Sequence, residues 1–266
     1  MSWSIHSNQR SESTGARVAL APHLQACPEV TTLGIRPCID DYSEAQKTLL
    51  RTATRVFFPT QRYVDIFHAL DIPTFPNATT YRYQRSRVLQ QLLFEYLDYP
   101  HPQTRIYYGK IQKNRIARDF ALPVLMMGPH IIPGSSYAVH TLEMLESVAG
   151  RHHCIVVQPR VEWIERVRLI CVRFECIAAQ RQNPGREGGT FDQPIHSGSS
   201  LLQEPLTATL SLVRTANLDD IAIDWGYAGG KWLVTGMSRP PVRCIVPGGV
   251  VNRHAHICGL IRSGLL

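Results

Sequence analysis

The 266-residue sequence predicts an α+β protein in which a short α/β region precedes a larger part built of β-hairpins and helices. Between residues 32 and 70, short extended runs alternate with runs of helical periodicity, which is typical of a small α/β unit. Two later segments, 166–181 and 219–238, each predict a pair of apolar strands joined by a tight turn. Pro73 and Pro76 punctuate the chain between these patterns, so we expect a boundary near residue 76.

The larger part is expected to contain further helices and strands. The helices are predicted at 81–97, 142–149 and 204–216, and the additional strands at 104–108, 122–127 and 154–158. The segment 183–200 is rich in Gly, Ser and Pro and is expected to form a mobile lid. We therefore expect three parts: a flexible arm at 1–15, a small α/β region at 16–76 and the larger domain at 77–266.

Targeting and cysteine patterns predict a cytoplasmic protein. The serine-rich N-terminal segment lacks the basic start and apolar core of a secretory signal. The most apolar window, 120–132, is interrupted by two prolines and is too short to cross a bilayer. The seven cysteines include no C-x-x-C pair, and several lie in apolar runs, as buried thiols in a reducing compartment do. We expect no membrane segment, no disulfide bond and no zinc site.

The net charge of +7 is carried mainly by arginine, because only four of the 28 basic residues are lysines. Guanidinium groups suit bidentate contact with phosphate or carboxylate groups. The arginines are spread along the chain and are not gathered into a basic tail, so composition does not favour nucleic acid as a partner. An arginine-rich module for nucleic acid or another acidic partner stays open as one kind of function.

The segment 166–181 predicts an anion site. If its turn centres on Phe174-Glu175, antiparallel pairing sets Arg168 opposite Arg181. Like charges that face each other cost roughly 0.2–1 kcal/mol unless an anion lies between them, and a phosphate group would meet that need. The alternative is two solvated arginines on an exposed face of the sheet.

Asp224, at the end of an apolar strand, is a candidate metal ligand. A turn near Gly230 would bring Gly236 opposite Asp224, which leaves this carboxylate without an acidic partner. Magnesium is commonly held by one or two carboxylates together with substrate phosphates, so Asp224 could bind a metal whose other ligands come from a nucleotide. The alternative is an aspartate that caps a strand end or a turn.

The order of these pieces resembles the ATP-grasp superfamily, and within it the ribosomal-protein glutamate ligases and related carboxylate–amine ligases, over residues 77–241. The family's helix with a basic start and a Q-L-L run resembles Arg85-Ser-Arg87 with Gln91-Leu-Leu93. Its adenine hinge, an E or Q followed by two residues and an aliphatic, resembles Gln158-Pro-Arg-Val161. Its D-I-R strand, its A-A-x-x-R return and its V-D strand resemble Val167-Arg168-Leu, Ala178-Ala-Gln-Arg181 and Ile223-Asp224.

The resemblance implies two α+β lobes with ATP between them and magnesium as a second cofactor. ATP would phosphorylate a carboxylate and an amine would attack the acyl phosphate, with a peptide or protein as one possible substrate. Asp224 would hold the metal, and Arg168 and Arg181 would act in catalysis by stabilising the transferring charge. The residues implied in nucleotide and phosphate binding are Arg85, Gln158, Arg160, Val161, Arg168 and Arg181.

Two positions depart from the family pattern. Met127 stands where the family has a phosphate-binding lysine, and Gly236 stands where the family's E-V-N supplies a metal-binding glutamate. Loss of that carboxylate should impair phosphoryl transfer, because magnesium binds the phosphates and neutralises developing charge. The sequence therefore predicts either an ATP-dependent carboxylate–amine ligase or a catalytically impaired nucleotide- or phosphate-binding protein of the same fold.

Overall fold

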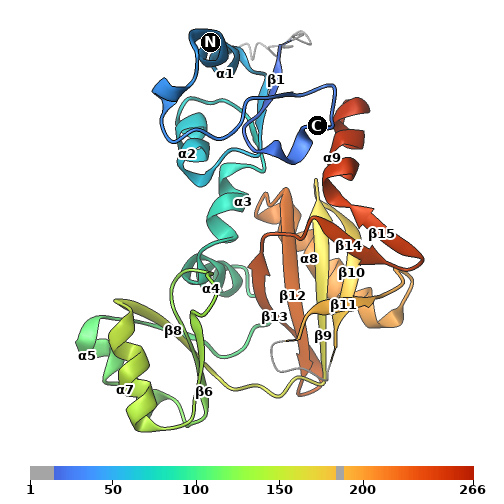
Figure 1. Cartoon of the computed structure of the whole chain (residues 1–266). Coiled ribbons are helices and arrows are strands. Elements are labelled where there is room, and N and C mark those ends of the chain that lie inside the picture. Colours follow the sequence, from blue (N-terminus) through green and yellow to red (C-terminus); the bar gives the residue numbers. More distant parts are fainter. Residues whose placement is uncertain (1–14, 184–188) are drawn as a thin grey trace, which may run out of the picture. The chain divides into compact units, whose positions relative to one another are not determined.

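The computed structural model describes residues 15–183 and 189–266. The predicted arm, apart from Gly15, and the 184–188 stretch of the predicted lid lie outside these described residues. The chain divides into two compact units, which we call unit 1 (Met1–Ala78 with Cys258–Leu266) and unit 2 (Thr79–Ile257) (Figure 1). Within the described ranges, no helix combines the length and apolarity needed to cross a membrane.

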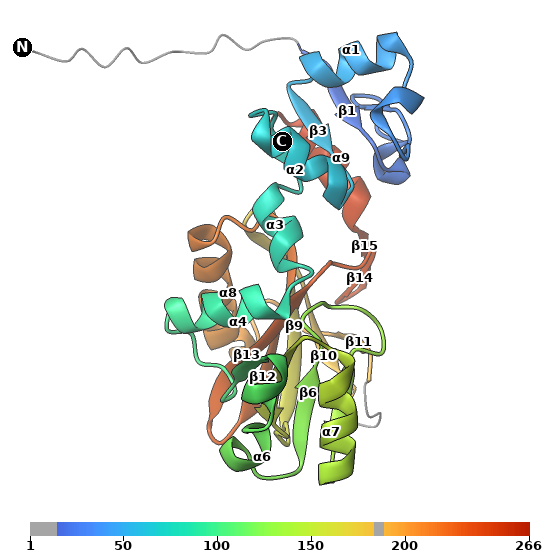
Figure 2. The ribbon, with the colours of Figure 1, turned by 90° about the vertical axis from the view of Figure 1, so that its left-hand side faces the viewer.

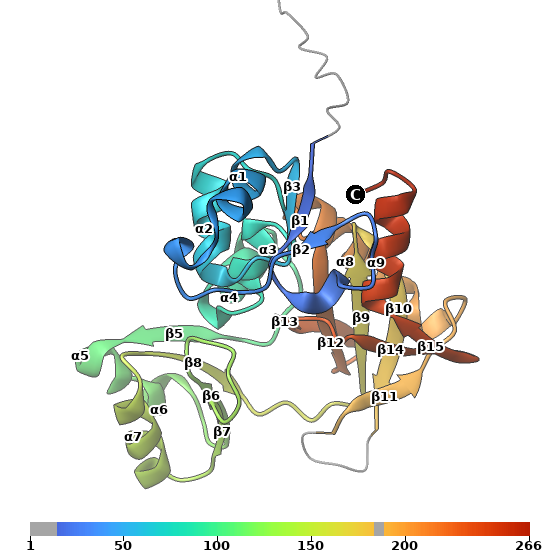
Figure 3. The same cartoon turned by 45° about the horizontal axis from the view of Figure 1, so that its top comes forward.

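Unit 1 is built on a parallel four-stranded sheet with the strand order β2-β1-β3-β4. The strands are β1 (Arg17–Ala19), β2 (Thr31–Thr32), β3 (Arg55–Phe57) and β4 (Thr74–Phe75). Helices α1 (Glu44–Thr52) and α2 (Gln61–Ala69) lie beside β1 and β3 in Figure 3. Leu50, Tyr63 and Phe67 from these helices form one core with Val18 and Val56 of the sheet. Two short 3₁₀ helices, η1 (Pro22–Leu24) and η2 (Ile39–Asp41), complete this part of the chain.

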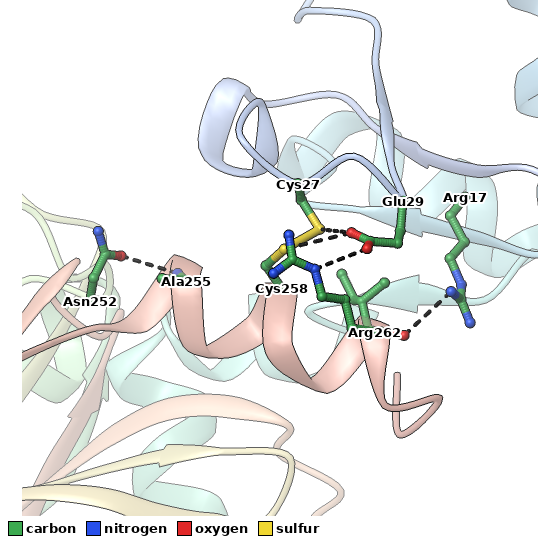
Figure 4. The surroundings of a disulfide bond; sticks show 8 residues. Arg17, Cys27, Glu29, Asn252, Ala255, Cys258 and Arg262 are labelled. Carbon is green, nitrogen blue, oxygen red and sulfur yellow. Dashed lines mark hydrogen bonds and ion pairs between the residues drawn. A yellow bond between two sulfur atoms is a disulfide. The ribbon is translucent and has the colours of Figure 1, made fainter.

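A disulfide bond joins Cys27 to Cys258 within unit 1, so the expectation of no disulfide is wrong (Figure 4). Cys258 lies in the C-terminal helix α9 (Arg253–Arg262). Glu29 lies beside the bond, with Oε2 3.2 Å from Cys27 Sγ and 3.9 Å from Cys258 Sγ. Its Oε1 accepts a hydrogen bond from Arg262 Nε at 2.9 Å. The last residues of the chain are therefore covalently attached to its first described region.

Unit 2 begins with two helices where the sequence predicted one. Helix α3 (Ala78–Tyr83) ends before Ser86, and α4 (Arg87–Tyr96) starts after it. Ser86 has extended backbone angles (φ −118°, ψ 108°), and its hydroxyl accepts a hydrogen bond from the Leu89 N–H at 3.2 Å. This is an N-cap, and it starts a new helix. The prediction of a continuous helix over 81–97 is therefore wrong.

The first lobe of unit 2 has an antiparallel sheet with the strand order β5-β8-β6-β7. The strands are β5 (Arg105–Tyr108), β6 (Val124–Met127), β7 (Ser136–Val139) and β8 (Cys154–Pro159). The helices are α5 (Gly109–Lys113), α6 (Ile116–Asp119) and α7 (Leu142–Arg151), and α7 runs beside β6 in Figure 2. Ile116, Val148 and Ile155 join Val124 and Met126 in the core of this lobe.

The second lobe has a five-stranded antiparallel sheet with the order β11-β10-β9-β12-β13 (Figure 1). The strands are β9 (Glu165–Val172), β10 (Glu175–Gln182), β11 (Phe191–Pro194), β12 (Asp220–Ala228) and β13 (Lys231–Ser238). Strand β11 lies in the segment predicted as a lid. Helix α8 (Gln203–Thr215), preceded by η3 (Ser200–Leu202), covers one face. There Trp225 is 1 % exposed, and its Nε1 donates to Thr209 Oγ1 at 2.8 Å.

The β9–β10 turn differs from its prediction. It centres on Arg173 and Phe174, whose φ values of 51° and 65° are those of a type I′ turn. A bulge between Cys176 and Ala178 then shifts the register. Arg168 therefore lies opposite Gln180, and the predicted pairing of Arg168 with Arg181 is wrong.

The β12–β13 hairpin places Asp224 opposite Gly236, as the sequence predicted. Its turn residues Gly229 and Gly230 both have positive φ, which glycine adopts without strain. The chain continues through the hairpin of β14 (Arg243–Val246) and β15 (Gly249–Asn252) into α9.

A buried ion pair lies at the start of α9. Arg253 Nη1 donates to both carboxylate oxygens of Asp220 on β12, at 2.7 and 2.6 Å. The two side chains are 1 % and 2 % exposed, and Arg253 Nε also donates to the Pro241 carbonyl at 3.1 Å. A pair this deeply buried fixes where the helix begins, because neither charge can return to water.

Candidate functional site

A cavity of about 220 Å³ in unit 2 is lined by both sheets and by helix α4. Its polar lining comes from Arg87, Gln90 and Gln91 of α4, Gln158 of β8, Arg168 of β9, Asp224 of β12, and Thr235 and Ser238 of β13. Asp224 is the one carboxylate among the described residues that line it. The cavity therefore combines cationic and amide groups with a single acid, which suits an anionic ligand.

Arg168 and Asp224 are register partners on β9 and β12 and form a two-pronged ion pair at this cavity. Arg168 Nε donates to Asp224 Oδ1 at 2.7 Å, and Nη2 donates to Oδ2 at 2.8 Å. Burial is the largest single effect and opposes the charge of Arg168, but the hydrogen bond to Asp224 and the charge of Asp224 together outweigh it and raise the pKa of the guanidinium above its ordinary value. Both carboxylate oxygens of Asp224 are therefore engaged by a cation of the chain itself.

Arg181 belongs to the opposite face of the sheet. It pairs in register with Val167, whose side chain lies in the core under α8, whereas Arg168 is one residue further along β9 and points the other way. Arg181 Nε donates to Glu165 Oε1 at 2.7 Å, and its Nη2 contacts Glu165 Oε2. That hydrogen bond raises the pKa of Arg181. The two arginines therefore do not face one another across a shared anion, because a shift of one residue reverses the face of a strand.

A glutamine borders the space beside Asp224 where a second carboxylate would stand. A Cβ at Gly236 would lie 3.5 Å from Gln90 Oε1. Gln90 Oε1 accepts from the Met237 N–H at 3.0 Å, and its Nε2 donates to the Met237 carbonyl at 2.8 Å. Gln90 is buried, and these bonds hold its amide against β13.

These residues do not fit a carboxylate-held magnesium ion. Magnesium is bound by oxygen ligands, usually one or two carboxylates with substrate phosphates. Here the single lining carboxylate already accepts two hydrogen bonds from Arg168, and Gly236 adds no side chain. Met127, also in the lining, offers a thioether, which is a poor ligand for this ion.

Of the residues predicted for the site, the structure brings Gln158, Arg168 and Asp224 to the cavity. Gln158 Nε2 donates to Thr104 Oγ1 at 2.8 Å, which fixes its amide at the end of β8. The remaining predicted residues, Arg85, Arg160, Val161 and Arg181, are absent from the lining in the described part of the chain.

Two arginines near the cavity are not among the residues predicted from the sequence. Arg87 lines the cavity, and its guanidinium donates to the Gly128 carbonyl and to Ser135 Oγ at 3.0 and 2.9 Å. Arg166 shares the Arg168 face of β9, because the two positions are two residues apart. Burial lowers the pKa of Arg166. The Arg85-Ser-Arg87 run was a signal for Arg87, whereas nothing in the sequence separated Arg166 from an exposed strand-end arginine.

Comparisons by sequence return no matching protein-family model and no matching curated protein. Solved structures match by fold. A RimK domain protein ATP-grasp from Sphaerobacter thermophilus matches with a TM-score of 0.65 and 17 % identity, over 84 % of this chain and 91 % of that chain. D-alanine–D-alanine ligase from Bacillus anthracis, complexed with ATP, matches with a TM-score of 0.64 and 11 % identity, over 92 % and 93 %.

A third match extends the set. N5-carboxyaminoimidazole ribonucleotide synthetase from Thermus thermophilus matches with a TM-score of 0.62 and 18 % identity, over 83 % of this chain and 63 % of that chain. At these identities the likeness establishes architecture. The chain has the ATP-grasp fold, in agreement with the fold class that the sequence predicted.

Proposed function

We propose that this protein uses its ATP-grasp fold to bind ATP in the cavity of unit 2, and that its capacity for phosphoryl transfer is impaired. The observation that carries the proposal is the Arg168–Asp224 ion pair opposite Gly236. Arg168 supplies a cation that can bind phosphates, and Asp224, the one lining acid among the described residues, is paired with it. Such a site is suited to binding a polyphosphate.

Each lining residue has a proposed role in that complex. Gln158 Nε2 is committed to Thr104, so its Oε1 is available to accept from the amino group of adenine. Arg168 is proposed to bind a phosphate through its guanidinium, in competition with Asp224. Arg85, Arg160 and Val161 stay proposed nucleotide contacts, because the family resemblance implies them. Arg181 is left out of this proposal, because it lies on the opposite face of the sheet and binds Glu165.

A second candidate is an active ATP-dependent carboxylate–amine ligase. Its reaction would transfer the terminal phosphoryl group of ATP to a carboxylate, after which an amine displaces phosphate from the acyl phosphate. The fold matches favour it, since a D-alanine–D-alanine ligase is among them. Arg87 and Arg168, which both line the cavity, would stabilise charge on the transferring group. Formation of ADP in the presence of candidate carboxylates and amines would distinguish this activity from binding alone.

Thermal melting with excess ATP, in magnesium and in EDTA, tests the first candidate. A ligand at about one hundred times its Kd stabilises the folded state by about 2.7 kcal/mol, so binding should raise Tm measurably. We expect equal shifts in the two buffers, because the donor set does not fit magnesium. A shift that requires magnesium would contradict impaired metal binding and favour the ligase. No shift in either buffer would contradict nucleotide binding.

Gly236→Glu is expected to create a magnesium requirement. The new Cβ would be in ordinary van der Waals contact with Gln90, and the added carboxylate would stand beside Asp224 on the neighbouring strand. We expect the Kd for ATP in magnesium to fall about tenfold below the value in EDTA, as each tenfold step corresponds to about 1.4 kcal/mol. Calorimetric titration in both buffers measures this ratio.

Gly249→Glu is the matched control, because a Cβ at this exposed position of β15 meets nothing within 4 Å. This variant adds the same charge away from the cavity. The ratio of the Kd for ATP in EDTA to the Kd in magnesium should therefore stay at one. If Gly236→Glu also leaves the ratio at one, the missing carboxylate does not explain the weak fit to magnesium.

A further inference from the structure

Arg166 is a cation without a described partner on the face of the sheet that carries Arg168. Its Nε is buried and makes no hydrogen bond within the described ranges. Its register partner on β12 is Gly226, which offers no side chain. A Cβ at Gly226 would lie 2.3 Å from the Trp163 ring, so that ring fills the space where a counter-ion could stand. A buried polar group of this kind is costly unless a ligand pairs with it.

Both arginines of this face lie against one aromatic ring. The guanidinium carbon of Arg168 is 4.3 Å from the centroid of Phe191, and that of Arg166 is 5.7 Å from it. Contact with the ring restrains the two guanidinium groups. The Nε and Nη2 of Arg168 donate to Asp224, so a ligand would bind its Nη1 or compete with Asp224. The ring also keeps water from one side, which strengthens electrostatic attraction to an anion.

The charges on this face do not balance. Asp224 is the carboxylate that faces both cations, and its two oxygens are bonded to Arg168. Among the described residues, no acid is hydrogen-bonded to the Arg166 side chain, which is two residues along β9 from the cavity-lining Arg168. Burial lowers its pKa, which indicates that its charge is poorly solvated there.

We infer that Arg166 and Arg168 together bind phosphate groups of a metal-free nucleoside polyphosphate. The two guanidinium groups would neutralise the negative charge of the phosphates, which magnesium neutralises in other nucleotide sites. The inference rests on the proposed nucleotide binding and extends it to a residue and a ligand form. Residues two positions apart on a strand are separated by about 7 Å. At this separation the two guanidinium groups can contact neighbouring phosphates of one nucleotide. Planar guanidinium forks match phosphate oxygens bidentately.

Calorimetric titration in EDTA at fixed ionic strength tests the inference. The probes are ATP, inorganic tripolyphosphate and adenosine, and the proteins are the wild type, Arg166→Gln, Arg166→Lys and Arg214→Gln. We expect Arg166→Gln to weaken ATP and tripolyphosphate binding about tenfold and to leave adenosine binding unchanged. Arg166→Lys should retain part of the affinity, since it keeps the charge and loses the fork. Arg214 is exposed on α8, so Arg214→Gln controls for net charge and should bind as the wild type does.

The outcomes separate this inference from the proposed function. Wild-type affinity for ATP in both Arg166 variants would overturn the inference and leave nucleotide binding standing. Arg166-dependent binding of tripolyphosphate without binding of ATP would support the phosphate site and overturn the nucleotide function. Binding of neither probe by the wild type would overturn both. Wild-type melting temperatures in the variants show that any loss is not a loss of folding.

Discussion

Arg253→Met is expected to lower the free energy of unfolding by about 3–5 kcal/mol, because it leaves the carboxylate of Asp220 buried without its cation. Asp220 is 2 % exposed, and both of its oxygens accept hydrogen bonds from Arg253. Burial already raises the pKa of Asp220 above its ordinary value with Arg253 present. Urea unfolding at pH 7 measures the loss.

The pH dependence of that loss has a definite sign. In the variant, burial keeps the folded-state pKa of Asp220 above the unfolded value of about 3.9, so the penalty grows as the pH rises from there. Below about pH 4 the carboxyl is protonated in both states, and the difference from the wild type should shrink. A loss that does not change between pH 7 and pH 4 would mean that lost packing, not charge, causes it.

Two further variants isolate the ion pair. Asp220→Leu combined with Arg253→Met removes both charges from the buried site and should recover most of the lost stability. Arg262→Met removes the exposed ion pair with Glu29 from the same helix, where the side chains are 54 % and 31 % exposed. That change should cost at most about 1 kcal/mol. Equal losses in Arg253→Met and Arg262→Met would contradict the importance of burial.

Cys258→Ser is expected to destabilise unit 1 by about 2–5 kcal/mol, because it removes a cross-link between residues 231 positions apart. The loss of protection from hydrogen exchange should be largest for the amides of β1 and of the C-terminal half of α9. The bond connects α9 to the region of Cys27, which follows β1 in the chain. Hydrogen exchange of the oxidised protein and of the variant measures it residue by residue.

Chemical reduction of the wild type should reproduce the effect of Cys258→Ser. Glu29 Oε2 lies 3.2 Å from Cys27 Sγ in the disulfide-bonded structure, so it is placed to accept a hydrogen bond from a Cys27 thiol after reduction. Cys38→Ser is the matched control, since Cys38 is an exposed free cysteine of the same unit. Unchanged exchange after reduction would show that packing alone holds the helix.

The sequence predicted the order of elements in unit 2 well because their hydrophobic periods are strong. The Gly229-Gly230 turn predicted the pairing of Asp224 with Gly236 correctly, although β12 continues past Asp224 to Ala228 and does not end there. The β9–β10 hairpin was predicted with the wrong pairing because the sequence does not reveal a bulge near Ala178. The bulge and the position of the turn determine on which face of the sheet an arginine lies. They place Arg181 on the face opposite to that of Arg168.

The disulfide bond and the position of Gln90 could not be predicted from the sequence, for a different reason. Cys27 and Cys258 lie at opposite ends of the chain, and spacing patterns do not predict contacts of that range. Gln90 belongs to a helix that was predicted as continuous, and its contact with β13 depends on tertiary packing. The sequence did indicate the absence of a carboxylate at Gly236, but not that Gln90 lies next to this position.

Helix α4 links the two lobes of unit 2 through side chains one turn apart. Arg87 hydrogen-bonds to Gly128 and to the serines at 135 and 136 in the first lobe. Gln90 bonds to both backbone groups of Met237 in the second lobe. Hinge opening between the lobes must break one of these sets of bonds, which adds to the free energy of opening. Ligand exchange is therefore expected to be slow, with a long residence time for any nucleotide held in the cavity.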